Sequence, residues 1–245
     1  MDRFFHPDLS NSAFALTEGE AHHLARVLRK AKGDVIELFD GAGNSAPAQV
    51  AEVTKRSVRV ELTGPVLADP PNTLLTRVAC AVPKGERFRW MVEKLTEVGT
   101  DELQLLFTER SVVEPGEARR ERLEQQVLAA CKQCGRNRVM KIHPPLEWEM
   151  FLKESTGPLF LADRDGVPAS TTVAPNGAAL SSLTIAIGPE GGWTSDERER
   201  AFQANATQVA LGKYILRVET AALIGGSWLE RLRMPPEQPA GGLGG

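Results

Sequence analysis

After Leu74 the sequence alternates regularly between short apolar runs and longer amphipathic runs, and this order leaves few folds open. The apolar runs are typical of buried strands, and the amphipathic runs carry apolar residues at helical spacing. Strands that alternate with helices predict an α/β domain with a mainly parallel sheet. Ligands of such sheets bind beyond the carboxyl ends of the strands. The predicted strands are 74–82, 102–107, 138–142, 158–162, 183–188 and 207–212, and the predicted helices are 84–99, 117–135, 195–204 and 219–233.

A helix of about three turns is predicted to begin near Thr17, because Glu20 follows at the spacing of a capping box. Leu24, Val27 and Leu28 lie on one side of this helix. Three short, partly alternating segments follow and are separated by turn residues, a pattern that favours a small β-barrel.

Three prolines within residues 64–73 indicate a linker between domains. We therefore expect a small β domain at 1–70 and an α/β domain at 73–234. Residues 235–245 are rich in proline and glycine, and we expect them to form a disordered tail.

No run reaches the roughly 18 uncharged apolar residues of a membrane span, and the N-terminal residues lack the apolar region of a secretory signal. We expect a cytoplasmic protein with no membrane partner. The three cysteines are too few for a disulfide framework. Cys131 and Cys134 have C-x-x-C spacing, which leaves a metal or redox role open. Packing on one helix face is the favoured interpretation, and we expect no metal.

The formal net charge of −3 disfavours a polyanionic partner, but the charges are unevenly distributed. Residues 119–141 contain seven Lys or Arg and two Glu, whereas residues 142–245 contain eight basic and twelve acidic residues. Affinity for a phosphate backbone depends on where cations cluster. The basic segment is therefore either an RNA-binding surface or a solvated helix face.

The turn "GPEGGW" (188–193) joins a predicted strand to a helix that Thr194 or Ser195 could cap. It matches no phosphate-binding motif, and Glu190, Asp196 and Glu197 would repel a pyrophosphate. Glycines without cations favour close approach of the backbone to a neutral or cationic ligand.

A second strand, glycine and helix sequence spans residues 209–223 and contains Arg217 between apolar residues. Its guanidinium needs a carboxylate, a carbonyl or a substrate as partner. A salt bridge to Glu219 or Glu190 that fastens the loops is the alternative to a substrate contact.

Six blocks of the sequence resemble those of the bacterial 16S ribosomal RNA uracil-N3 methyltransferases, which belong to the knotted SPOUT superfamily. The resemblance covers residues 3–233, and the blocks occur in the family's order. They are "HHLARVLRKAKGD", "KGERFRWMVEKLTEVG", "TERSVV", "KQCGR", "IGPEGGWTSDE" and "LGKYILRVETAAL". Trp193 and Lys132 depart from residues that are common in relatives, and they put only loop and helix-face details in doubt.

The resemblance implies a PUA-like RNA-binding β-barrel, followed by an α/β domain with a deep trefoil knot. It also implies a homodimer that forms through the knotted domain, and S-adenosylmethionine bound by the knot loops. The residues expected to bind this cofactor are Leu161, Ala162, Ile187, Gly188, Pro189, Glu190, Gly191, Gly192, Leu211, Gly212, Ile215, Leu216 and Arg217.

The implied reaction is methylation of N3 of a specific uridine in 16S ribosomal RNA, in an assembled small subunit. Arg217 is expected to stabilise the uracilate, Arg136 is a second candidate, and Glu219 or Glu190 would act as base or orient an arginine. The expected RNA contacts are His22, Arg26, Arg29, Lys30, Lys84, Arg110 and Arg136. Two alternatives stay open: a knotted methyltransferase of another RNA such as a tRNA, and a non-catalytic RNA-binding protein.

Overall fold

The computed structural model describes residues 1–54, 57–111, 120–172 and 180–233, which fold into two compact units. The first unit contains Met1–Asn72 and Glu121–Met140, and the second contains Thr73–Arg120 and Lys141–Gly245. A single boundary near residue 73 therefore does not separate the units, because the segment 121–140 belongs with the N-terminal residues. The hydrogen bonds that place it there join residues 69 to 134 positions apart, and local sequence patterns do not report them.

A mainly antiparallel sheet forms the first unit and surrounds a core that includes Phe4, Leu24, Ile36 and Val60. Only β1 and β3 pair in parallel. In spatial order the strands are β1 (Arg3–Phe5), β3 (Val35–Phe39), β4 (Asn44–Val53), β5 (Val58–Leu62) and β2 (Ala13–Ala15), with β6 (Leu67–Ala68) paired to β4.

The first helical segment differs from its prediction in length and in its cap. It consists of α1 (Glu18–His22) and a π-helical turn η1 (His23–Val27). The Thr17 side chain makes no capping hydrogen bond, so the predicted capping box is wrong. Glu20 instead accepts a bond from the Phe5 N–H (3.4 Å) and pairs with Lys132. Val27 is 61% exposed, because the wider π turn rotates it away from buried Leu24.

Arg3 joins helix α3 (Arg120–Cys134) to the N-terminal residues of the first unit. Arg3 Nη1 donates to the carbonyls of Cys131 (2.8 Å) and Arg136 (3.2 Å), and its Nε pairs with Glu37 (2.7 Å). Cys131 is buried as expected, whereas Cys134 is exposed, so the predicted packing of both cysteines is wrong for Cys134. Burial raises the pKa of Cys131 to about 11, which keeps it a thiol.

The second unit contains a six-stranded sheet in which every pair is parallel. The strand that was predicted over 138–142 is displaced and begins at Lys141. In spatial order the strands are β12 (Thr207–Ala210), β10 (Leu159–Pro168), β11 (Ser182–Ile187), β7 (Leu75–Ala81), β8 (Glu102–Phe107) and β9 (Lys141–Glu147).

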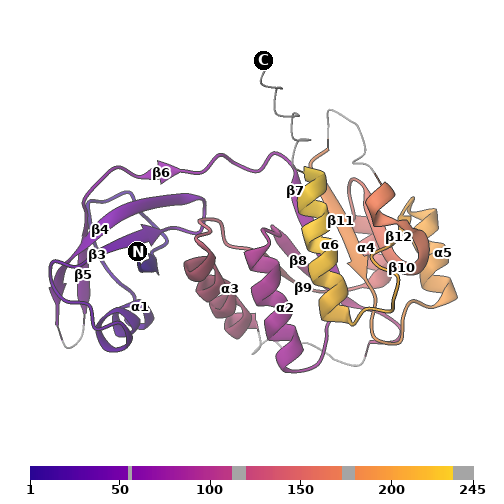
Figure 1. Ribbon diagram of the computed structural model, residues 1–245, viewed down its shortest axis with the longest axis horizontal. Coiled ribbons are helices and arrows are strands. Elements are labelled where there is room, and N and C mark those ends of the chain that lie inside the picture. The colour runs from indigo at the N-terminus through magenta and orange to yellow at the C-terminus, as the bar shows by residue number, and fades with distance from the viewer. Residues whose placement is uncertain (55–56, 112–119, 173–179, 234–245) are drawn as a thin grey trace, which may run out of the picture. The chain divides into compact units, whose positions relative to one another are not determined.

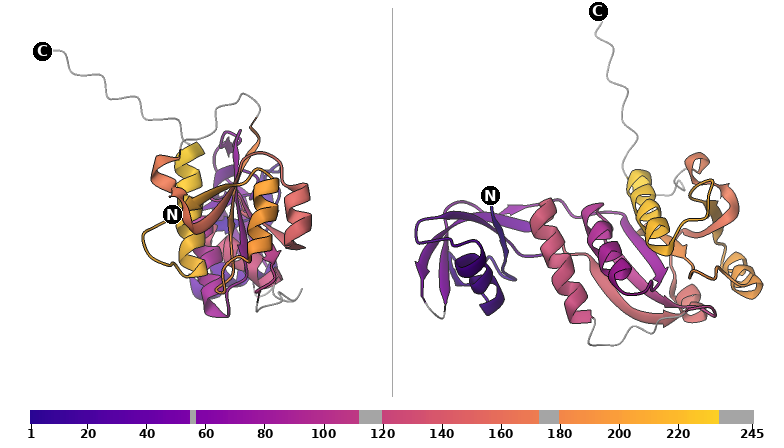
Figure 2. Two further views of the ribbon diagram at one scale, coloured as in Figure 1. Left: turned by 90° about the vertical axis from the view of Figure 1, so that its right-hand side faces the viewer. Right: turned by 60° about the horizontal axis from the view of Figure 1, so that its bottom comes forward.

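Helices cover both faces of this sheet (Figures 1 and 2). Helices α2 (Glu86–Glu97) and α6 (Val218–Arg233) lie side by side on one face, and α6 packs on β7 and β11. Helices α4 (Trp148–Glu154) and α5 (Ser195–Gln203) cover the other face, as the left view of Figure 2 shows. Helix α4 and the short turn η3 (Ala169–Thr171) were not predicted. The trefoil knot stays a prediction of the resemblance.

A buried polar cluster anchors the end of α6 at the amino-terminal ends of the strands. Thr76 Oγ1 donates to Glu230 Oε1 (2.6 Å), and the Thr76 N–H donates to Asp101 Oδ2 (3.0 Å). Arg233 pairs with both carboxylates. Burial raises the pKa of Glu230, which the hydrogen bond from Thr76 and the charge of Arg233 partly offset.

Candidate functional site

The bulge within β10 and the loops that follow β11 and β12 line a cavity of about 890 Å³ within the second unit. This is the carboxyl edge of the parallel sheet, where the sequence places a ligand. All but one of the thirteen expected cofactor residues line it; the exception is Leu161, which is buried in the core. The wall consists of Arg87, Arg110, Ala162–Asp165, Ile187–Trp193, Arg198, Leu211, Gly212, Tyr214–Val218 and Ala221.

Residues after Ala162 enter the cavity because β10 leaves its regular pairing there. The register with β12 shifts between Ala162 and Val167, so Asp163 and its neighbours bulge from the ladder. Gly166 permits this bulge, since a Cβ at that position would come within 2.5 Å of the Val209 backbone nitrogen.

Trp193 packs against the backbone of the glycine-bearing loop 188–192 and holds it in place. Its Nε1 donates to the Ala162 carbonyl (3.1 Å), and its ring lies 4.5 Å from the ring of Trp148. A Cβ at Gly188 would lie 2.9 Å from the Trp193 ring, so the loop backbone sits directly on the indole. The loop closes through a bond from the Gly192 N–H to the Pro189 carbonyl (2.8 Å), with Gly192 at φ +70°. Sequence reasoning had treated Trp193 only as a departure from relatives.

Thr194, not Ser195, caps α5. Thr194 Oγ1 accepts from the Glu197 N–H (3.2 Å), and Glu197 Oε2 accepts from the Thr194 N–H (2.8 Å), which completes a capping box. The end of the loop is therefore joined rigidly to the start of the helix.

Five arginines and three carboxylates occur among the described residues of the wall. Three of the arginines are paired: Arg87 with Glu190 (2.7 Å), Arg198 with Asp163 (3.1 Å) and Arg164 with Asp165 (3.4 Å). Arg110 Nη1 donates to the Gly191 carbonyl (2.7 Å) and has no counter-charge in the wall. Together with Arg217 it leaves the wall with two positive charges in excess, which favours an anionic ligand group.

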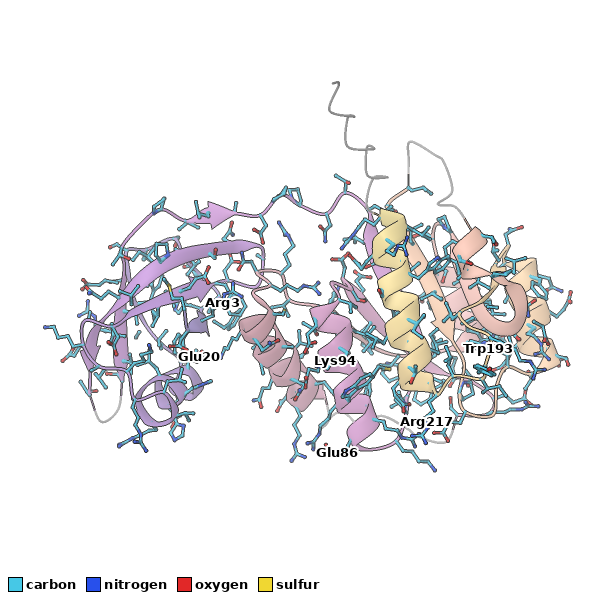
Figure 3. All side chains as sticks on the ribbon, in the orientation of Figure 1. Arg3, Glu20, Glu86, Lys94, Trp193 and Arg217 are labelled. Carbon is cyan, nitrogen blue, oxygen red and sulfur yellow. The ribbon has the colours of Figure 1, made fainter. Side chains whose placement is uncertain are left out.

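Arg217 lies just before α6 begins, as Figure 3 shows. Its guanidinium is exposed and has no ion pair or hydrogen bond to any residue that the structure describes. The alternative of a salt bridge to Glu190 is not realised, because Glu190 pairs with Arg87.

Glu219 points away from the cavity and into the protein. It is buried, does not line the wall, and its Oε2 has no hydrogen-bond partner among the described residues. Burial and the nearby Glu219 carboxylate both raise the pKa of the Cys80 thiol. Because Glu219 is buried and does not line the wall, it is poorly placed to reach a substrate in this cavity.

The residues expected to contact RNA divide between the two units. His22, Arg26 and Arg29 are exposed in the first unit, where Lys30 pairs with Asp2 (2.7 Å). Arg136 also belongs to the first unit and does not line the cavity. Lys84 is exposed between β7 and α2, and Arg110 lines the cavity.

Sequence reasoning missed Arg87, Asp163 and Arg198 as wall residues. Ligands of parallel sheets bind beyond the carboxyl ends of the strands, and this could have identified the first two. Arg87 follows β7, and Asp163 lies directly beyond the Ala162 that pairs with β11. No group of three metal-ligating side chains occurs in the described part of the chain, and none of its helices could span a membrane.

Comparisons with known proteins agree over most of the chain. The family model described as an RNA methyltransferase domain matches residues 70–230, and that of an RNA methyltransferase PUA domain matches residues 16–63. The ribosomal RNA small subunit methyltransferase E of Synechocystis sp. is 32% identical over 213 residues, covering 85% of this chain and 70% of the relative. The protein of the same name from Bacillus subtilis is 28% identical, with 86% of each chain covered.

Two solved structures are similar over nearly their full length. A ribosomal RNA small subunit methyltransferase E from Neisseria gonorrhoeae, bound to S-adenosyl methionine, is 27% identical with a TM-score of 0.85 and covers 95% of this chain and 98% of its own. A methyltransferase from Legionella pneumophila in complex with SAM is 26% identical with a TM-score of 0.84, covering 94% and 96%.

Proposed function

Because the chain belongs to the ribosomal RNA small subunit methyltransferase E family, we propose that it methylates N3 of a specific uridine in 16S ribosomal RNA, with S-adenosylmethionine as methyl donor. The observation that carries this proposal is the pair of glycine-bearing loops that meet unpartnered Arg217 in one cavity. When bound, S-adenosylmethionine supplies an electrophilic methyl group on a sulfonium.

The cavity suits this donor in size and in chemistry. Its volume of about 890 Å³ lies within the range of cofactor sites. A Cβ at Gly188 would lie 2.9 Å from the Trp193 ring, and one at Gly191 would lie 3.1 Å from the Arg110 stem, so both positions favour glycine. The loops 187–192 and 211–217 would hold the donor through backbone amides and carbonyls, as a ligand without phosphates requires.

Arg217 would stabilise the charge that develops on the substrate. The uracil N3 is a poor nucleophile until its proton leaves, and the resulting anion spreads over O2 and O4. An unpaired guanidinium at the cavity wall favours that anion and lowers the pKa of the N3–H group. The deprotonated N3 would accept the methyl group of the donor, which would leave as S-adenosylhomocysteine, and the loops that hold the donor would bring the two reactants together.

Of the two carboxylates expected to act as base, Glu190 has the better position. It lines the cavity and is half exposed, whereas Glu219 is buried behind the wall. We assign proton acceptance to Glu190, with Arg87 as the residue that orients its carboxylate at 2.7 Å. Arg136 stays a second candidate for charge stabilisation, although it belongs to the first unit and does not line the cavity.

The RNA partner is proposed to be 16S ribosomal RNA in an assembled small subunit in the cytoplasm. The exposed cations His22, Arg26 and Arg29 of the first unit would contact phosphates, and the target base would leave its stack to reach the cavity. The match of residues 16–63 to a PUA domain of RNA methyltransferases supports this role of the first unit.

A homodimer through the second unit is also proposed. Tyr214 and Ile215 in the loop before α6 are 74% and 81% exposed, and apolar side chains in such a loop favour a protein partner. Light scattering should give twice the mass of one chain, and Ile215→Asp should shift it toward the monomer. A monomeric wild-type protein would exclude the dimer without affecting the proposed reaction.

The reaction is tested on small subunits from cells that lack the gene. Incubation with protein and S-adenosylmethionine, followed by mass spectrometry of nucleosides, should yield 3-methyluridine in 16S ribosomal RNA. Methylation of transfer RNA alone would favour the alternative target. Absence of S-adenosylmethionine binding in calorimetry would favour a non-catalytic RNA-binding protein.

A further inference from the structure

The Glu197 side chain makes one more hydrogen bond than a capping residue requires. Besides its capping box with Thr194, its Oε1 accepts a hydrogen bond from the Glu109 N–H (2.9 Å), which lies beyond the end of β8. The Glu197 side chain is buried, with the residue only 6% exposed, and it does not line the cavity. A carboxylate so far removed from water is held in one orientation by its donors.

The segment that reaches Glu197 is itself a closed turn. The Thr108 N–H donates to Ser111 Oγ (3.0 Å), the two hydroxyls lie 2.9 Å apart, and the Ser111 N–H donates to the Thr108 carbonyl (2.9 Å). We call residues 108–111 the β8 turn. Because its ends are tied to each other, the Glu109 N–H and the Arg110 side chain leave the turn in set directions.

Arg110, which belongs to the β8 turn, binds the glycine-bearing loop at Gly191. Its Nη1 donates to the Gly191 carbonyl (2.7 Å), and its Cδ would lie 3.1 Å from a Cβ at Gly191, which shows that the aliphatic stem packs on the loop backbone. The β8 turn thus holds the loop at Gly191 through Arg110 and at Thr194 through Glu197. These two points bracket the tight turn at Gly192.

We infer that Glu197 and Arg110 are positioning residues for the cofactor loop, and that the β8 turn sets the conformation in which Gly188–Gly192 receives S-adenosylmethionine. The inference rests on the proposed function. The sequence predicted that Arg110 contacts RNA. The inference gives it a different role, because its guanidinium donates to the Gly191 carbonyl of the loop. Loosening either contact should lower affinity for the donor, because a preorganised loop binds with less ordering cost.

If Glu197 and Arg110 had only a structural role, their substitution would lower stability and leave the affinity for the donor unchanged. Glu230 is the matched control for Glu197. It too is a buried carboxylate of the second unit, 7% exposed, bonded to a threonine and placed on a helix. It lies with Thr76 at the amino-terminal ends of the strands, away from the cavity. Glu197→Ala and Glu230→Ala therefore remove similar groups at opposite ends of the sheet.

Isothermal calorimetry with S-adenosylmethionine and with S-adenosylhomocysteine, beside thermal melting, separates the two roles. We expect Glu197→Ala and Arg110→Ala to raise the Kd for both ligands about tenfold. Glu230→Ala should lower Tm at least as much as Glu197→Ala and leave Kd within about twofold. Equal weakening by Glu230→Ala, or an unchanged Kd in Glu197→Ala, would overturn the inference.

Conservative and surface variants complete the test. Arg110→Lys keeps a donor for the Gly191 carbonyl and should recover part of the affinity, whereas Arg89→Ala, an exposed arginine of α2 paired with Glu86, should change nothing. If Glu197→Ala does not fold, Glu197→Gln and Arg110→Lys still report on the loop. Failure of the wild-type protein to bind the donor would instead count against the proposed function.

Discussion

At the scale of single residues, Arg217 is the group whose environment most favours chemistry. The other arginines of the cavity wall are each bonded to a carboxylate or a carbonyl, whereas Arg217 has no side-chain partner among the described residues. It is exposed and lines the cavity, so its charge is available to a ligand there. Such a group stabilises an anion that forms only during reaction.

Arg217→Ala should lower kcat for methylation by about 10² to 10³ and leave the Kd of S-adenosylmethionine within a few fold. Arg217→Lys should retain more activity because it keeps the charge. Arg164→Ala is the matched control, since this wall arginine pairs with exposed Asp165. Single-turnover rates on small subunits measure the effect, and a near wild-type rate for Arg217→Ala would remove it from the reaction.

At the scale of elements, a carboxylate joins three neighbouring parallel strands. Arg77 Nε of β7 donates to Glu102 Oε2 of β8 (2.7 Å), and His143 Nε2 of β9 lies 3.2 Å from the same oxygen. The neighbouring imidazole of His143, followed by the bonded guanidinium of Arg77, lowers the pKa of Glu102 to about 2 despite partial burial. The charged form of Glu102 is thus favoured in the folded protein.

A lowered pKa makes this contribution depend on pH. The unfolded chain takes up the proton near the ordinary value of 4.5, so the stabilisation is complete above that pH and is lost as pH falls toward about 2. Urea unfolding should give Glu102→Gln a deficit of about 2 kcal/mol at pH 6 that shrinks by pH 2.5. Glu86→Gln, at an exposed site on α2, should show no such pH-dependent difference.

At the scale of the whole molecule, the charge is divided between two tasks. The exposed cations of the first unit are proposed to contact phosphates, and Arg217 of the cavity wall is proposed to act on one base. Net charge says little about either, because the chain carries −3 in total and its basic residues are concentrated locally. RNA affinity should therefore respond to changes in the first unit without a change in donor binding.

The double variant Arg26→Glu and Arg29→Glu should weaken binding to 16S ribosomal RNA and lower the slope of log K against log salt by about 1.5. Both residues are exposed, and neither is in the cavity wall. Lys153→Glu on α4 is the control, because it reverses an exposed charge outside the wall. Filter binding over a salt series measures the slope, and an unchanged affinity would exclude this surface from RNA contact.

The sequence alone determined the strands of the second unit, most of its helices and the two glycine-bearing loops, and it narrowed the cap of α5 to Thr194 or Ser195. These depend on apolar periodicity and on contacts three or four residues apart, which local sequence records. Tertiary structure decided the rest. Glu20 pairs with Lys132 and does not form the predicted capping box, and Glu190 pairs with Arg87. Residues 121–140 belong to the first unit. The two ion pairs join side chains 112 and 103 positions apart. Which charged residue meets which is set by how the elements pack, and one sequence holds no local signal for it.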